Sequence, residues 1–121
     1  MKPSFTGLPF FVYPVTDMLR AREFYHGVLG LTETANWDDQ FVEYAVGGGT
    51  LAISGFMQDA VPAQAGCAAL ETDDFDGVVA YLKGQGVRFV MEPTDTGVCH
   101  FARFLDSEGN HLALHRKHAT S

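Results

Sequence analysis

The hydrophobic and polar positions of this chain follow one pattern twice. Apolar side chains recur at i, i+3, i+4 and i+7 in two segments, which predicts two amphipathic helices of about three turns each. The first stripe is Ala21, Phe24, Tyr25 and Val28, and the second is Phe75, Val78, Val79 and Leu82. A capping side chain precedes each stripe and a glycine follows it. The candidates are Thr16 or Asp17 with Gly30, and Asp73 or Asp74 with Gly84 or Gly86.

One β-rich segment comes before each helix and three come after it. The segments are 10–15, 31–37, 41–46 and 50–54 in the first half, and 67–71, 87–91, 98–105 and 111–115 in the second. Because this order occurs twice, we predict an α+β fold of two tandem βαβββ modules. The 121 residues suffice for one domain, 1–121, but not for two independent cores. Module one is expected at about 8–55, the linker at about 56–64 and module two at about 65–116.

Alternation along the last strand of each module assigns the two faces of each sheet. The apolar face should pack under the helices, and it carries Leu51, Ile53, Leu112 and Leu114. The opposite faces can be covered only by each other or by a partner subunit. The two sheets are therefore expected to enclose a cleft lined mainly by small or polar side chains.

Composition narrows the class of protein. Hydrophobic residues make up 46% of the chain and charged residues 19%, which indicates a packed globule. The formal net charge of -7 disfavours nucleic acid and anionic membrane surfaces as partners. No apolar stretch approaches the roughly 20 residues of a membrane span, and residues 1–9 do not resemble a secretory signal. With two cysteines and no disulfide framework, a cytoplasmic location is expected.

Several short runs resemble the motifs of a known module. Val15-Thr16-Asp17, Phe24-Tyr25 and Val28-Leu29-Gly30-Leu31 resemble its opening. The run 104–114 resembles its closing signature, with Ser107 in place of the usual proline. From about residue 9 to 115 the chain is thus similar to the vicinal-oxygen-chelate superfamily, the glyoxalase, bleomycin-resistance and extradiol-dioxygenase group. This resemblance implies paired βαβββ modules and a homodimer.

Metal-dependent members of that superfamily bind one divalent ion through side chains of the first and last strand of each module. By resemblance, the corresponding positions here are Phe10, Ala52, Cys67 and Ala113. Phenylalanine and alanine have no donor atom for a cation, and one thiol does not replace several oxygen or imidazole ligands. We therefore expect no metal at these positions and no cofactor. A divalent ion bound in another way is the alternative.

Histidines near the C-terminus give no obvious replacement site. His111 and His115 are separated by about 13 Å along a strand, too far to share one ion. His115 and His118 are expected to be a solvated pair near the end of the chain.

The expected cleft has six candidate ligand-binding residues: Glu43, Arg103, His111, Cys67, Trp37 and Phe101. The charged pair can orient a polar ligand, and His111 can exchange a proton near neutral pH. The aromatic residues, with Phe41 and Phe56, can form an apolar wall. Each has a structural alternative: a solvated edge or mutual pairing for the charges, partial exposure for the histidine, a small buried thiol for Cys67, and core packing for the aromatics.

Three functions remain open on the sequence. The first is a metal-free small-molecule-binding protein, as in the bleomycin-resistance branch of the superfamily. The second is a glyoxalase-like lyase or isomerase, or a dioxygenase-type enzyme, with an atypical metal or acid–base work by His111 or Glu43. The third is a structural or regulatory dimer with a closed cleft. The sequence assigns no catalytic residue.

Overall fold

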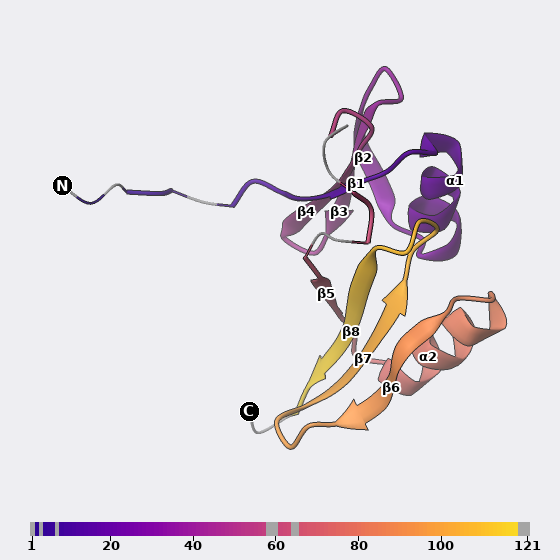
Figure 1. Ribbon diagram of the computed structural model, residues 1–121. Coiled ribbons are helices and arrows are strands. Elements are labelled where there is room, and N and C mark those ends of the chain that lie inside the picture. The colour runs from indigo at the N-terminus through magenta and orange to yellow at the C-terminus, as the bar shows by residue number, and fades with distance from the viewer. Residues whose placement is uncertain (1, 3, 7, 58–60, 64–65, 119–121) are drawn as a thin grey trace.

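The computed structural model describes residues 2, 4–6, 8–57, 61–63 and 66–118, and it contains two similar modules (Figure 1). Module one consists of β1 (Phe11–Pro14), α1 (Met18–Arg22), η1 (Glu23–Val28), β2 (Thr32–Trp37), β3 (Phe41–Val46) and β4 (Gly49–Ser54). Module two consists of β5 (Ala68–Glu71), α2 (Phe75–Gly84), β6 (Phe89–Asp95), β7 (Cys99–Leu105) and β8 (His111–Lys117). The predicted α+β fold of tandem βαβββ modules is confirmed.

Each module forms one four-stranded sheet with the same topology. The strand orders are β1-β4-β3-β2 and β5-β8-β7-β6, with a parallel pair at β1/β4 and at β5/β8. The last strand of each module is therefore central, and its apolar residues are buried as expected: Leu51, Ile53, Leu112 and Leu114. The first strand lies at an edge, where it can meet the other module.

The first helix differs from the expected α-helix in its second half. Asp17 caps α1 by accepting a hydrogen bond from the Arg20 amide. The helix then widens into the π-helix η1, in which the Leu29 amide bonds the carbonyl of Phe24, five residues earlier. Both Phe24 and Tyr25 are buried there, and Gly30 follows with a positive φ of 72°. The second helix, α2, is regular and is capped by Asp74.

Two strands of module two are longer than their sequence pattern predicts. The expected strand 87–91 is displaced and extends to Asp95, through Pro93. Proline removes one amide donor, but β6 is an edge strand with register shifts near Pro93, so the missing hydrogen bond is tolerated. The last strand continues from His115 to Lys117. Both extensions bring additional polar side chains to the same end of this sheet.

The two sheets meet along their edges and share one core. The Tyr13 hydroxyl of β1 donates to the carbonyl of His111 in β8 and accepts from the amide of Ala68 in β5. The buried core is one cluster that includes Tyr25 from module one and Phe75 from module two. Figure 1 shows α1 and α2 on the same side of the two sheets. Within the part of the chain that the structure describes, the opposite faces of the sheets therefore carry no helix.

A buried polar network locks the modules together on the helix side. The Asp106 carboxylate accepts hydrogen bonds from the amides of Glu108 and Asn110, from the Asn110 side chain and from the Tyr25 hydroxyl. The Asn110 side chain also donates to the carbonyl of Pro14 at the end of β1. Burial and the nearby Asp106 carboxylate raise the pKa of Tyr25 well above its usual range. The closing signature of the sequence therefore supplies the hydrogen bonds that join the two modules.

The same turn caps the module-one helix. The Glu108 carboxylate accepts hydrogen bonds from the backbone amides of Thr16 and Asp17, at 2.7 Å for the shortest contacts. These amides precede α1, where a negative charge is favourable next to the helix N-terminus. From the expected linker, the described Ala63 donates its amide to Asn110, whereas residues 58–60 and 64 lie outside the described residues. No helix within the described ranges is long and apolar enough to span a bilayer.

We expect Asp106→Ala to lower the free energy of unfolding by about 3 kcal/mol, because it leaves several buried donors without an acceptor. Tyr25→Phe removes only one donor and should cost about 1 kcal/mol. Urea denaturation followed by circular dichroism measures both. The control is Asp73→Ala, which changes an exposed aspartate and should shift stability by less than about 0.5 kcal/mol. Equal losses in Asp106→Ala and Asp73→Ala would contradict the role of the network.

Candidate functional site

The candidate site lies on the sheet faces that point away from the helices, which we call the open faces. Strand register gives each open face a central row of side chains. In module one the row is Val12, Ala52, Glu43 and Ala35, and in module two it is Ala69, Ala113, Arg103 and Met91. Glu43 and Arg103 therefore occupy equivalent positions, each next to an alanine of the central strand.

Both charged candidates face away from the core. Val42 and Tyr44, on either side of Glu43, are fully buried under the helices. Ala102 and Phe104 flank Arg103 in the same way. Among the described residues the ion pairs include neither Glu43 nor Arg103, so the alternative of mutual pairing is wrong. Each half-buried charge remains directed to the open face.

The four positions that hold the ion in metal-dependent members do not fit a metal here. Ala52 and Ala113 are buried in the centre of their sheets and offer no donor atom. Phe10 precedes β1, and its ring contacts that of Phe41 with centroids 5.5 Å apart. Only Cys67 has a donor atom, and one thiol cannot hold a divalent ion at this place.

Cys67 is exposed, so the expectation of a small buried thiol is wrong for this residue, whereas Cys99 is buried. Desolvation raises the pKa of the Cys67 thiol, and the nearby positive charge of Arg103 opposes that rise. A thiol with a raised pKa stays protonated at neutral pH, where it is neither a strong nucleophile nor a metal ligand.

Aromatic side chains line the open face of module one. The Trp37 ring contacts Phe41 edge-on with centroids 5.7 Å apart, and Phe41 in turn contacts Phe10. Trp37 is 52% exposed and Phe10 37% exposed, so these rings are not core residues. Phe56 is also exposed. The rings of Phe10, Phe41 and Trp37 form one continuous apolar row, which contains two of the expected aromatic residues, Trp37 and Phe41, and adds Phe10.

The remaining candidates lie on the open face of module two. Phe101 contacts the ring of His115 with centroids 6.4 Å apart. His115 forms an ion pair with Glu71, and this contact lowers the pKa of that carboxyl group. His111 pairs in register with Leu105 and is half-buried. The expected solvated pair of His115 and His118 is wrong, because His118 contacts Asp95 at 3.1 Å instead.

A surface hollow of about 560 Å³ lies on the helix side, away from these residues. It is lined by α1 and η1, by the loop after α2, and by the end of β7 with the turn that follows, including Arg20, Glu23, Arg88 and Leu105. None of the six sequence-predicted candidates lines it. Its walls belong to the region that joins the modules.

One group of neighbouring polar residues is not among the candidates predicted from the sequence. Asp95, His100 and His118 lie together at the end of the module-two sheet. The signal for it was the pairing of the strands. Phe104 lies opposite Leu112, and the same register places His100 opposite Arg116. His118 is two residues after Arg116, so its side chain lies on the same face of the sheet.

Comparison with protein families places this arrangement in a known group. Residues 7–114 match the family model of the Glyoxalase/Bleomycin resistance protein/Dioxygenase superfamily. Because the match spans most of the chain, the protein belongs to this superfamily. A comparison with curated proteins gave no significant match.

Solved structures share the whole fold. The chain is 25% identical to TnmS3, an antibiotic binding protein from Streptomyces sp. CB03234, with a TM-score of 0.83 over 96% of this chain and 99% of that one. It is 27% identical to a glyoxalase/bleomycin resistance protein from the same organism, with a TM-score of 0.75 over 87% and 96% of the two chains. Lactoylglutathione lyase from Agrobacterium tumefaciens is 15% identical, with a TM-score of 0.75 over 93% and 95%. This last likeness concerns the fold alone.

We expect the reaction of Cys67 with iodoacetamide, followed in a Cys99→Ser background, to have its pH midpoint above the ordinary value of a cysteine thiol. Arg103→Ala should move the midpoint higher still, since the guanidinium stabilises the thiolate. Arg88→Ala, on the helix side, should leave it unchanged. A midpoint below the ordinary value would contradict the protonated state assigned to this thiol.

Proposed function

We propose that this protein binds a small organic molecule on the open faces of its sheets, without a metal ion at the superfamily's usual positions. The observation that carries the proposal is the repeated pairing of a charged and a small side chain. Glu43 lies beside Ala52, and Arg103 beside Ala113. Ala52 and Ala113 are themselves buried, so the half-buried charge beside each alanine is the group that can bind a polar part of a ligand.

The aromatic row favours a ligand with a planar apolar part. Ring edges and faces of Phe10, Phe41 and Trp37 lie on the same open face as Glu43. A flat ring system can pack on these rings while its polar groups reach the charged side chains of Glu43 and Arg103. The ligand would then carry both a hydrogen-bond acceptor or anionic group for Arg103 and a cationic or donor group for Glu43. The net charge of -7 slightly favours cationic ligands through steering.

One of the structures described above supports a binding role, because it is an antibiotic binding protein. The other is described as a glyoxalase/bleomycin resistance protein, a name that includes both an enzyme and a binding protein. By analogy we propose an antibiotic-like compound as the ligand of this chain. A lyase of the glyoxalase type is less favoured, because the family positions supply only the Cys67 thiol.

A second copy of the chain is proposed to complete the site. The sheets of one chain meet edge to edge, and Trp37 and Phe10 stay partly exposed on the open face. Exposed aromatic residues of this kind are typical of surfaces that bind a ligand or a partner. A homodimer whose open faces meet would enclose the ligand and exclude water from the contacts with Glu43 and Arg103.

Trp37 is the single tryptophan of the chain, so its fluorescence reports directly on the open face. Titration with bleomycin and with an anthracycline, one cationic and one planar aromatic antibiotic, should change this fluorescence saturably for a compound that binds. Arg103→Ala should raise the dissociation constant about tenfold, because the ligand loses one charge-assisted hydrogen bond. Isothermal calorimetry supplies the constant independently.

The matched control is Arg20→Ala, which removes an arginine from the helix side and should leave the affinity unchanged. An equal loss of affinity in Arg103→Ala and Arg20→Ala would contradict the open-face site. Binding that calorimetry detects without any change in Trp37 fluorescence would contradict it as well. Formation or hydrolysis of lactoylglutathione that depends on added divalent metal and ceases on chelation would favour the enzyme instead.

A further inference from the structure

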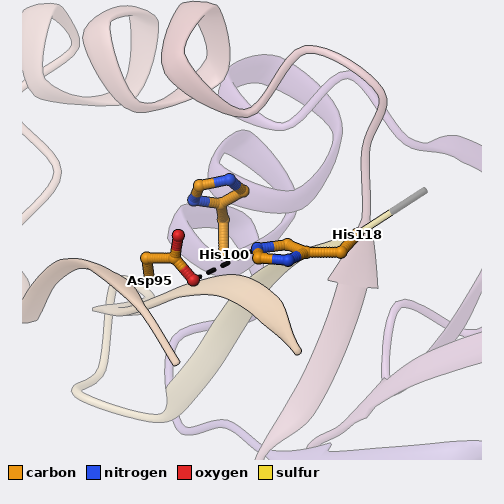
Figure 2. A group of neighbouring side chains, drawn as sticks. All are labelled: Asp95, His100 and His118. Carbon is orange, nitrogen blue, oxygen red and sulfur yellow. Dashed lines mark ion pairs between the residues drawn. The ribbon is translucent and has the colours of Figure 1, made fainter. Parts of the chain in front are cut away.

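The end of the module-two sheet gathers three side chains with metal-ligating atoms (Figure 2). Asp95 ends β6 and lies in register with His100 of β7. His118 follows β8, and its backbone amide bonds the carbonyl of Val98 at 3.2 Å. One ligand atom from each side chain lies within 4.8 Å of the others. Three separate segments therefore converge on one point, at the lower end of the sheet in Figure 1.

Neighbouring groups hold these side chains in place. The His100 ring lies 5.7 Å from the ring of Phe75, a buried residue of α2. The Asp95 carboxylate accepts a hydrogen bond from the Gly97 amide at 2.9 Å, which fixes its orientation. The rings of His100 and His118 have their centroids 5.0 Å apart. Figure 2 shows that all three side chains point toward a common space.

A carboxylate oxygen of Asp95 already lies beside an imidazole nitrogen of His118. An ion pair of Asp95 with His118 at 3.1 Å satisfies the two groups when the imidazole is protonated. A cation that replaces this proton would contact the same carboxylate oxygen and a histidine nitrogen.

The donor set selects a class of ion. Two imidazoles and one carboxylate suit zinc and its first-row neighbours, whereas magnesium and calcium prefer oxygen ligands only. In a tetrahedral zinc site the ligand atoms are separated by about 3.3 Å, given metal–ligand bonds of about 2.0–2.1 Å. Side-chain rotations from separations within 4.8 Å can reach that spacing; Asp95 is exposed, and His100 and His118 are half-buried. Arg116, in register with His100, is the nearby positive charge that works against a cation.

We propose that Asp95, His100 and His118 form a binding site for a divalent first-row transition metal ion of the zinc class, with at least one coordination position left for water or a further ligand. This site is distinct from the superfamily's metal positions at Phe10, Ala52, Cys67 and Ala113. It is also independent of the ligand proposed for the open faces. A bound ion would join the edge strand β6 to β7 and to the segment after β8.

Zinc and cobalt(II) serve as the probes, added to the full-length protein after removal of metals with a chelator. We expect one equivalent to bind per chain, measured by competition with a chromophoric chelator. Cobalt(II) should give the visible absorption of a low-symmetry site with nitrogen and oxygen ligands. His100→Ala and His118→Gln should each weaken zinc binding at least tenfold, and Asp95→Asn should weaken it while keeping the hydrogen bond from Gly97.

His26→Ala is the matched control, because it removes an exposed histidine from η1 in module one and should leave the affinity unchanged. Circular dichroism of the metal-free variants establishes that each one is folded. Millimolar or absent zinc binding by the unaltered protein would overturn the proposal. So would tight binding that survives both His100→Ala and His118→Gln but is lost in Cys67→Ser.

Discussion

One buried carboxylate, that of Asp106, holds the two modules in the arrangement on which the rest of the structure depends. It accepts hydrogen bonds from the turn that closes module two and from Tyr25 in the helix of module one. A buried charge is tolerated only when fixed donors replace its lost hydration, so these segments must keep their positions together. The shared core then forms on the helix side, and the open faces are left for another role.

The fold could be predicted because its signals are local and repeated. Each helix needs an apolar stripe, and each central strand needs alternation, so the duplicated pattern specifies both modules. The same alternation places Glu43 and Arg103 on the face opposite the core, since a shift by one residue would bury them with Val42 and Phe104. The closing signature was recognised by resemblance. The sequence could not predict that its side chains form the hydrogen bonds that join the two modules.

The details that escaped prediction depend on contacts between distant segments. Strand β6 runs through Pro93 because an edge strand can lose one amide donor, and a sequence does not reveal which strand lies at the edge. His115 and His118 were expected to form a solvated pair near the end of the chain, yet pairing with β7 extends β8 to Lys117. The group of Asp95, His100 and His118 exists only through these two extensions. The π-helical turn that buries Tyr25 likewise has no local signal.

Three of the four positions that correspond by resemblance to the superfamily's metal positions hold apolar side chains, Phe10, Ala52 and Ala113, and charged and aromatic groups lie next to them. We propose that Arg103, Glu43 and Trp37 bind the ligand. Backbone-amide and indole NMR shifts, followed during titration with a bound antibiotic, test this proposal most directly. The largest changes in chemical shift are expected at Trp37, Glu43 and Arg103. Changes concentrated around Arg20 and Arg88, in the hollow on the helix side, would contradict it.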